Sequence, residues 1–387
     1  MLGEIYFYIR VESCYANKYV KMLLKEHLTV LARRHFLVIA AALLYTRKAK
    51  AQNIFPVLSE DAITVRVPER ILLISIANAG SRLVAVGEHG VIVYSDNNGA
   101  NWLQALVPVR VTLTCIGFAT PKCGWAAGDY GVVLHTQDGG ATWRKQISGI
   151  EVNQLMLADA KQFMVTSPNS SVAQLALRRA NIFMAAGPDK PFLCVVANTT
   201  KNAMIFGAYR MAIITVDGGE NWIDISLHID DPISHNIYNA CWIGNTLYLA
   251  GEAGTVFRSE DGGKNFAMLT SPGDSTLFGV VGLGRNEVLV YGVAGAAFRS
   301  NDRGKTWVKL NLDTQTNLTC GIVLASGVVV LASEAGEVYF SHDHGSSFSR
   351  LPGNQGMGIF GMAQADNGRL VLVGSNGVGS LSRSALK

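Results

Sequence analysis

The chain has 387 residues, of which 49% are hydrophobic, with 33 lysine and arginine residues against 29 aspartate and glutamate residues. Nine of the basic residues but only three of the acidic ones lie in residues 1–51, so residues 52–387 are slightly acidic, with 24 basic and 26 acidic side chains. This balance excludes nucleic-acid binding through a basic body, and the length suffices for one large domain.

Residues 1–51 have the layout of a removable export signal. A basic region precedes an apolar stretch over 36–45, and Ala49 and Ala51 frame a cleavage site of the small-x-small type. The apolar stretch is half of the ~20 residues that a spanning helix needs. We therefore expect a leader over residues 1–51, with its true start at Met22 if the first residues are an over-long assignment. An uncleaved membrane anchor is the alternative.

The leader contains a pair of arginines directly before its apolar stretch. Arg33 and Arg34 lie in the sequence ARRHFL, which resembles the twin-arginine export consensus. We expect an exported protein, located in the periplasm or, in a photosynthetic organism, in the thylakoid lumen.

A short motif, Ser/Thr-x-Asp-x-Gly-x-x-Trp/Phe, recurs six times after the leader. Its third position holds Asn97, Asp138, Asp217, Asp261, Asp302 and Asp343. Its closing aromatic residues are Trp102, Trp143, Trp222, Phe266, Trp307 and Phe348. The aromatic residues are 41, 79, 44, 41 and 41 positions apart, so the long step spans two periods and predicts a degenerate unit inside it. A period of about 40 residues indicates a repeat protein.

Each unit contains four short apolar runs separated by glycine and aspartate turns, as in residues 113–147. Such runs predict a four-stranded antiparallel meander, which is too small to bury both faces alone. Radial stacking of such sheets gives a β-propeller. No long amphipathic helix is expected after residue 60, so residues 52–387 are predicted to form a single all-β propeller domain.

The repeats number eight when the degenerate unit is included. The units are 71–108, 111–147, 151–190, 193–226, 237–270, 277–311, 318–352 and 356–387. The last unit lacks a fourth strand, and a strand within residues 62–68 is expected to complete it and close the ring. Seven blades is the alternative, if residues 151–190 are an insertion.

The repeated aspartate has a structural explanation in every copy. An aspartate accepts backbone N–H groups in a tight turn, the glycine permits a positive φ, and the aromatic ring packs against apolar neighbours. Catalytic carboxylates converge on one pocket, whereas these six positions are distributed around a ring. We therefore predict that they form turns and catalyse nothing.

The form GWAAGDYGVVLHTQDGGATW resembles the Asp-box (BNR) repeats of the Ycf48-like photosystem II assembly and stability factors and their bacterial relatives. The resemblance covers residues 70 to 387. It implies an exported, non-catalytic factor without a cofactor that holds newly made membrane-protein subunits. The implied partner is a membrane or envelope protein complex, such as a transporter or a photosystem subunit.

Asp-box repeats also occur in sialidases, so a glycoside hydrolase or a glycan-binding propeller is the alternative. Only a weak echo of the early Arg-Ile-Pro motif of sialidases is present, in residues 66–68, and the other arginines are scattered. A deep central pocket with three arginines and paired carboxylates would favour the enzyme.

The turns between the second and third strands vary in sequence on a fixed frame of glycines, as binding surfaces do. The predicted partner-binding residues are Glu88, His89, Asp129, Tyr130, Tyr209, Arg210, Glu252 and Glu334. In a propeller these turns lie on the face opposite the Asp-box turns.

Two further groups of residues contain side chains that can bind a metal or form a disulfide. The loop 226–236 contains two histidines and two aspartates, but their spacing matches no standard metal site, so we expect a solvated connection and no metal. Cys115 and Cys123 flank one hairpin, where either a disulfide or, by preference, buried free thiols are expected.

Overall fold

The computed structural model describes residues 55–386. The boundary between the two structural units of the chain falls between Phe55 and Pro56. The expected leader, with Arg33, Arg34, Ala49 and Ala51, therefore lies outside the described residues. No described helix is long and apolar enough to cross a membrane.

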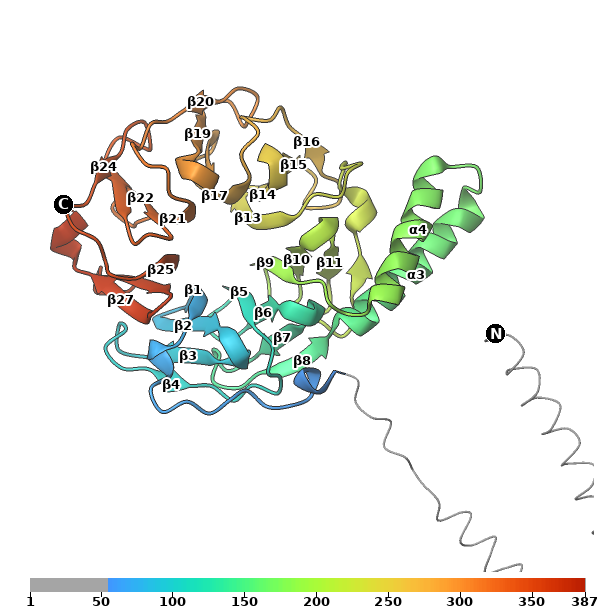
Figure 1. The fold of residues 1–387 in the computed structure, drawn as a ribbon, viewed down its shortest axis with the longest axis horizontal. Helices are drawn as coiled ribbons and strands as arrows, with labels where there is room; N and C mark the ends of the chain where they lie inside the picture. Colours follow the sequence, from blue (N-terminus) through green and yellow to red (C-terminus); the bar gives the residue numbers. More distant parts are fainter. Residues whose placement is uncertain (1–54, 387) are drawn as a thin grey trace, which may run out of the picture. The chain divides into compact units, whose positions relative to one another are not determined.

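Residues 55–386 form a ring of seven antiparallel sheets, with the first strand of each sheet nearest the centre (Figure 1). The first three sheets contain β1 (Leu73–Ala79), β2 (Arg82–Gly87), β3 (Ile92–Ser95) and β4 (Leu103–Gln104); β5 (Leu113–Phe118), β6 (Gly124–Gly128), β7 (Val133–Thr136) and β8 (Arg144–Ile147); and β9 (Phe192–Ala197), β10 (Ala203–Gly207), β11 (Ala212–Thr215) and β12 (Ile223–Asp224). The next two contain β13 (Ile237–Ile243), β14 (Thr246–Gly251), β15 (Val256–Ser259) and β16 (Ala267–Met268); and β17 (Leu277–Gly284), β18 (Glu287–Gly292), β19 (Ala297–Ser300) and β20 (Val308–Lys309). The last two contain β21 (Leu318–Val323), β22 (Val329–Ser333), β23 (Val338–Ser341) and β24 (Ser349–Arg350); and β25 (Ile359–Gln364), β26 (Leu370–Gly374) and β27 (Gly377–Leu381). The predicted all-β propeller is confirmed.

The second strand of each sheet is the most deeply buried. Every residue of β6, β10 and β26 is buried, because each of these strands lies between two partners of its own sheet and between two neighbouring sheets. The fourth strands, where present, are short and largely exposed at the outer edge of the ring. Burial therefore decreases from the middle of each sheet towards the outside.

The ring closes by side-chain packing between the first and last sheets. One apolar cluster combines Leu73 and Leu83 of the first sheet with Val371 and Val373 of the last. The expected closing strand within residues 62–68 is wrong, since β27 has no fourth strand beside it among the described residues.

The segment expected to close the ring is instead attached to the first sheet. The Gln104 side chain of β4 donates to Ile63 O over 2.6 Å and accepts from Val65 N over 3.0 Å. These bonds hold the segment at the outer edge of its own sheet and so keep it from pairing with β27. The short helix η2 (Pro68–Arg70) then leads the chain past β27 to β1.

Residues 151–190 are mostly helical, so the expected degenerate blade is wrong there, as is the expectation that no long helix follows residue 60. Helix α3 (Gly149–Thr166) begins at a capping box in which Glu151 accepts from Ser148 N over 2.9 Å. Helix α4 (Ser171–Ala186) returns antiparallel to it, and the pair projects outward from the ring (Figure 1). The described residues thus contain seven sheets, the number given by the alternative count.

The helical hairpin is attached firmly at its base. The buried Asn153 side chain donates to Phe183 O and Gly187 O over 3.0 and 2.9 Å, which joins the start of α3 to the end of α4. Val152 and Met156 share one apolar cluster with residues of the second and third sheets. The base is thus part of the propeller core.

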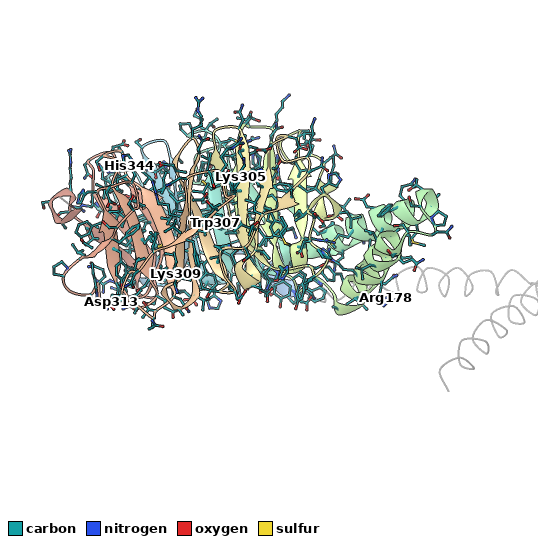
Figure 2. All side chains as sticks on the ribbon, turned by 90° about the horizontal axis from the view of Figure 1, so that it is seen from above. Arg178, Lys305, Trp307, Lys309, Asp313 and His344 are labelled. Carbon is teal, nitrogen blue, oxygen red and sulfur yellow. The ribbon has the colours of Figure 1, made fainter. Side chains whose placement is uncertain are left out.

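The two rims of the ring carry different turns. Figure 2 shows Lys305 and His344, from two Asp-box turns, on one rim, and Asp313, from a connection between sheets, on the other. We call these rims the Asp-box face and the turn face. Because strands alternate in direction, the second-to-third-strand turns lie on the turn face together with the sheet connections, as predicted.

Candidate partner-binding face

The turn face is built on one backbone hydrogen bond that recurs in every sheet. The first residue of each second-to-third-strand turn donates its N–H to the carbonyl of the residue immediately before the first strand. The bonds are Glu88 to Leu72, Asp129 to Thr112, Ala208 to Pro191, Glu252 to Asn236, Val293 to Thr276, Glu334 to Asn317 and Ser375 to Gly358, all between 2.9 and 3.2 Å. Each turn is therefore held beside the start of an inner strand, next to the central channel.

The second residue of five of these turns adopts a left-handed backbone conformation. His89, Tyr130 and Tyr209 have φ values of 56°, 58° and 53°, and Ala253 and Ala294 have 53° and 54°. Such values are uncommon for residues other than glycine. Because alanines share them, this backbone conformation belongs to the repeated turn and is no mark of a specialised site.

Six of the eight predicted face residues fall into two groups in the structure, and the other two, His89 and Tyr130, are second residues of their turns. Glu334 lines a cavity in the central channel, and Glu88, Asp129 and Glu252 occupy the equivalent position in their own turns. Burial raises the pKa of Asp129. The sequence prediction placed these residues on one rim, where the structure also has them.

The second group, Tyr209 and Arg210, turns away from the channel. The half-exposed Tyr209 ring meets Phe183 of α4 edge to face, with centroids 6.0 Å apart. The Arg210 guanidinium donates to the carbonyl oxygens of Ile229 and Asp231. These two residues fasten the third sheet to the helical hairpin and to the next connection.

The cavity in the central channel has a volume of about 390 Å³. All seven inner strands line it, each with its second residue. These residues are Ile74, Thr114, Leu193, Tyr238, Phe278, Thr319 and Phe360. They share the second position of the first strand, but no motif in the sequence indicates that this position lines a cavity.

Two of the seven residues brace neighbouring inner strands. The Thr114 hydroxyl donates to Phe192 O over 2.6 Å, and the Thr319 hydroxyl donates to Ile359 O. Each bond crosses from one sheet to the next, so the position of the lining is fixed by the closed ring.

The channel cavity is lined by aromatic, aliphatic and small polar side chains and by a single carboxylate. Its lining contains Tyr238, Phe278 and Phe360 but no arginine, lysine or histidine, and Glu334 is its one acidic residue. The three arginines and paired carboxylates that would favour a sialidase are absent from this lining. The lining is suited to holding an apolar side chain rather than to acid–base chemistry.

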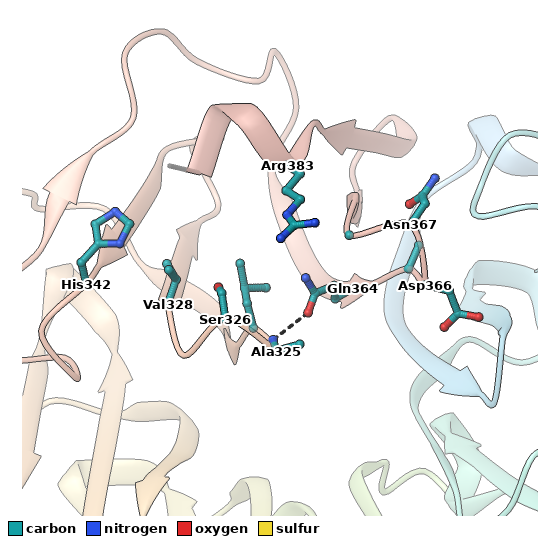
Figure 3. Close-up of a pocket in the computed structure, with 11 residues that line it drawn as sticks. Ala325, Ser326, Val328, His342, Gln364, Asp366, Asn367 and Arg383 are labelled. Atoms are coloured by element: carbon teal, nitrogen blue, oxygen red, sulfur yellow. Dashed lines mark hydrogen bonds between the residues drawn. The ribbon is translucent and has the colours of Figure 1, made fainter.

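A larger cavity of about 790 Å³ lies at the opposite end of the sixth and seventh sheets, beside β25 (Figure 3). Arg383 points into it above Gln364, whose side-chain oxygen accepts from Ala325 N over 2.8 Å. Asp366 and His342 lie at its two sides. One arginine and one carboxylate likewise fall short of a sialidase site.

The Asp-box turns are closed by a network within each motif. In the second sheet, Asp138 accepts from the Thr136 hydroxyl, from Thr142 N and from the Thr142 hydroxyl over 2.8, 3.0 and 2.6 Å. Gly140 N donates to the Thr136 hydroxyl over 3.0 Å. Asn97 accepts two of these bonds in the first sheet, from the Ser95 hydroxyl and from Asn101 N, both over 2.9 Å, so the turn closes without a negative charge.

The loop 226–236 is more ordered internally than a solvated connection. The buried Asp231 accepts from His235 N over 2.6 Å and from its ring nitrogen over 2.9 Å, while His228 faces Lys264 O. The expectation of a solvated loop is therefore wrong for Asp231. No group of three metal-ligating residues occurs in the described part of the chain.

All the cysteines among residues 55–386 have free thiols, including Cys115 and Cys123. All of them are buried except Cys241, which is partly exposed. The Cys115 thiol donates to Ala127 O, and burial raises its pKa to about 12. The preferred interpretation as free thiols therefore agrees with the structure.

Taken as a class, the protein is a β-propeller of Asp-box sheets with an aromatic-lined channel on the face opposite the Asp boxes. The sequence profile of the family described as photosynthesis system II assembly factor YCF48 matches residues 187–381, which is just over half of the chain. The chain belongs to this family. By sequence, no curated protein matches it.

Solved structures show the same fold at low sequence identity. YCF48 from Cyanidioschyzon merolae is 13% identical, with a TM-score of 0.58 over 82% of this chain and 96% of its own. YCF48 bound to a D1 peptide is 14% identical, with a TM-score of 0.57 over 82% and 97%. The WD40 propeller domain of Doa1 is 10% identical, with a TM-score of 0.57 over 85% and 98%.

Proposed function

We propose that this protein is an exported, non-catalytic scaffold that holds a segment of a membrane-protein subunit on its turn face while a membrane or envelope complex is assembled. The observation that carries the proposal is the aromatic channel cavity on the predicted face, in a chain of the YCF48 family. A YCF48 structure with a bound D1 peptide supports a peptide segment as the ligand. A photosystem subunit or a transporter is the kind of partner we expect.

Photo-crosslinking tests which face contacts the partner. With a photo-reactive amino acid at Glu88 on the turn face, irradiation of the protein in native envelopes should give an adduct with a membrane protein. The same group at His344, on the Asp-box face, is the matched control and should give none. An adduct from position 344 alone, or hydrolysis of a glycoside panel by the purified protein without any adduct at position 88, would overturn the proposal.

Export is the second part of the proposal, and it rests on the leader sequence. Replacing Arg33 and Arg34 together with lysine should leave the precursor inside the cytoplasm, because a twin-arginine leader requires the pair. Cell fractionation and immunoblotting measure the precursor in each compartment. The Arg47→Lys variant, which keeps the pair, should be exported like the parent, and normal export of the double variant would show that another route is used.

A further inference from the structure

We propose, resting on the proposed function, that the channel cavity recognises a lysine or arginine of the partner flanked by apolar residues. The aromatic and aliphatic lining would take the apolar groups, and Glu334 would pair with the cation. The peptide is thereby selected for positive charge as well as for hydrophobicity.

The apolar part of the site comes from three aromatic rings on different sheets. Tyr238 and Phe278 meet edge to face with centroids 5.3 Å apart and an interplanar angle of 88°, and Phe360 lines the same cavity. Aromatic rings bind apolar side chains and also attract ammonium and guanidinium groups. The lining therefore suits the long side chains of lysine and arginine, which combine an apolar stem with a cation.

The acidic part of the site is the exposed side chain of Glu334. Its carboxylate has no hydrogen bond or ion pair within residues 55–386, and no basic residue lines the cavity. A second carboxylate, that of Glu252, accepts from Asn236 N over 3.2 Å, and the Asn236 side chain donates to the Tyr238 hydroxyl over 3.4 Å. This chain of contacts places a second negative charge beside the aromatic lining.

The charged residues at the first position of the turns around the channel are all acidic. The first turn position, which every sheet holds beside its inner strand, is acidic in four sheets and basic in none. Its residues are Glu88, Asp129, Ala208, Glu252, Val293, Glu334 and Ser375. The one arginine in these turns, Arg210, has its guanidinium bonded to carbonyl oxygens of the neighbouring connection. Charge complementarity therefore favours a cationic segment over an acidic one.

The size of the cavity limits what enters it. A volume of about 390 Å³ lies near the lower end of the ~300–1,000 Å³ range of ligand pockets. An α-helix with its side chains is ~10–12 Å across and needs a wider groove. The cavity thus fits one or two side chains of an extended segment.

Fluorescence anisotropy with synthetic peptides tests the proposal on the full chain. The probe is a fluorescein-labelled Gly-Ser-Leu-Lys-Phe-Ser-Gly amide, with versions in which lysine is replaced by norleucine or by glutamate. We expect the lysine peptide to bind about tenfold more tightly than the norleucine peptide, and the glutamate peptide to bind more weakly still. Binding of the lysine peptide should weaken as salt is raised.

Three variants assign the effect to this cavity. Glu334→Gln should weaken binding of the lysine peptide about tenfold and leave the affinity for the norleucine peptide unchanged, since the substitution removes only the charge. Asp366→Asn removes an exposed carboxylate on the opposite side of the ring and should bind all peptides like the parent. Phe278→Leu should weaken both the lysine and the norleucine peptide.

Three outcomes would overturn this inference: no binding of any peptide, equal binding of the lysine and glutamate peptides, or a Glu334→Gln variant that binds like the parent. The photo-crosslinking experiment separates this failure from failure of the proposed function. If position 88 still yields a membrane-protein adduct, the scaffold function stands and only the ligand chemistry is wrong.

Discussion

Replacing Trp125 with alanine is expected to lower the free energy of unfolding by about 3–5 kcal/mol, because the side chain is fully buried and leaves a cavity. The ring packs beside His135, with centroids 4.7 Å apart. Its indole N–H donates to the Gln146 side chain over 3.1 Å, and Gln146 in turn donates to Gly218 O of the next sheet over 2.7 Å. The substitution therefore removes packing in one sheet and loosens its link to another.

Urea unfolding followed by tryptophan fluorescence and circular dichroism measures this loss. Trp307→Ala is the matched control, because Trp307 is partly exposed and donates to Thr270 O near the surface. Trp307→Ala should lower the free energy of unfolding clearly less than Trp125→Ala does. Equal losses, or a loss below about 1 kcal/mol for Trp125→Ala, would show that the second sheet is not packed as described.

Acid is expected to destabilise the propeller steeply, chiefly between pH 4 and pH 2. In Asp217, Asp261 and Asp302, hydrogen bonds from the residue four positions later lower the carboxyl pKa to about 2. A lowered pKa means that the unfolded chain takes up protons first, near its ordinary value of about 3.9. The contribution of these carboxylates is therefore complete above pH 4 and is lost as the pH falls through about 2.

An earlier and smaller loss is expected from His135. Burial, followed by the charge of Arg144, lowers the pKa of this histidine to about 4. The unfolded chain binds this proton near pH 6.5, so the stability contributed by the neutral ring is present above pH 6.5 and is lost as the pH falls towards 4.

The Asp302→Asn variant isolates the contribution of one Asp box. Asn97 accepts from the Ser95 hydroxyl and from Asn101 N in the first sheet, so the variant should fold normally. It should be less stable than the parent at neutral pH, where the contribution of the Asp302 charge is complete, and should approach the parent as the pH falls through about 2. Its free energy of unfolding, measured with urea, should fall less steeply between pH 4 and pH 2. The difference in slope should correspond to the uptake of about one proton fewer on unfolding. An unchanged pH dependence would show that the Asp302 carboxylate is not held as described.

The Asp-box turns were predictable because all their bonds are local. The hydrogen bonds of Asp138 all join residues within a stretch of seven, so the motif alone determines the turn. The aspartate, the glycine and the aromatic residue of the turn are all recognisable in the motif. The role of the seventh position is not, although Thr142 donates twice to the carboxylate there and completes the network.

The helical hairpin was not predicted, because its length is close to that of one repeat unit. Residues 149–186 nearly fill one period, and their helical pattern is obscured by exposed apolar residues on both helices, such as Val165, Leu175 and Ile182. The capping box at Ser148 and Glu151 was the one clear local signal of a helix start. A double period is therefore weaker support for a hidden repeat than a recognisable turn.

The candidate site was predictable only in part. The turns follow from the repeat, so the rim that carries Glu88 and Glu334 could be assigned from the sequence. The channel lining could not, because Tyr238, Phe278 and Phe360 come from three units and meet only when the ring is closed. Nothing in the sequence of a single unit indicates that the second residue of its first strand lines a shared cavity.

The seam between the first and last sheets has a mechanical consequence. Every other boundary between consecutive sheets is crossed by the chain itself. The first and last sheets are instead held together by apolar packing and by two hydrogen bonds that involve side chains, from the Asn78 side chain to Gln364 O over 3.0 Å and from Asn367 N to the Asn98 side chain over 3.3 Å. Among the described residues, no strand is shared across this boundary. A force that pulls Pro56 and Leu381 apart therefore meets no ladder of backbone bonds there, and the ring will part at this junction before any sheet is torn.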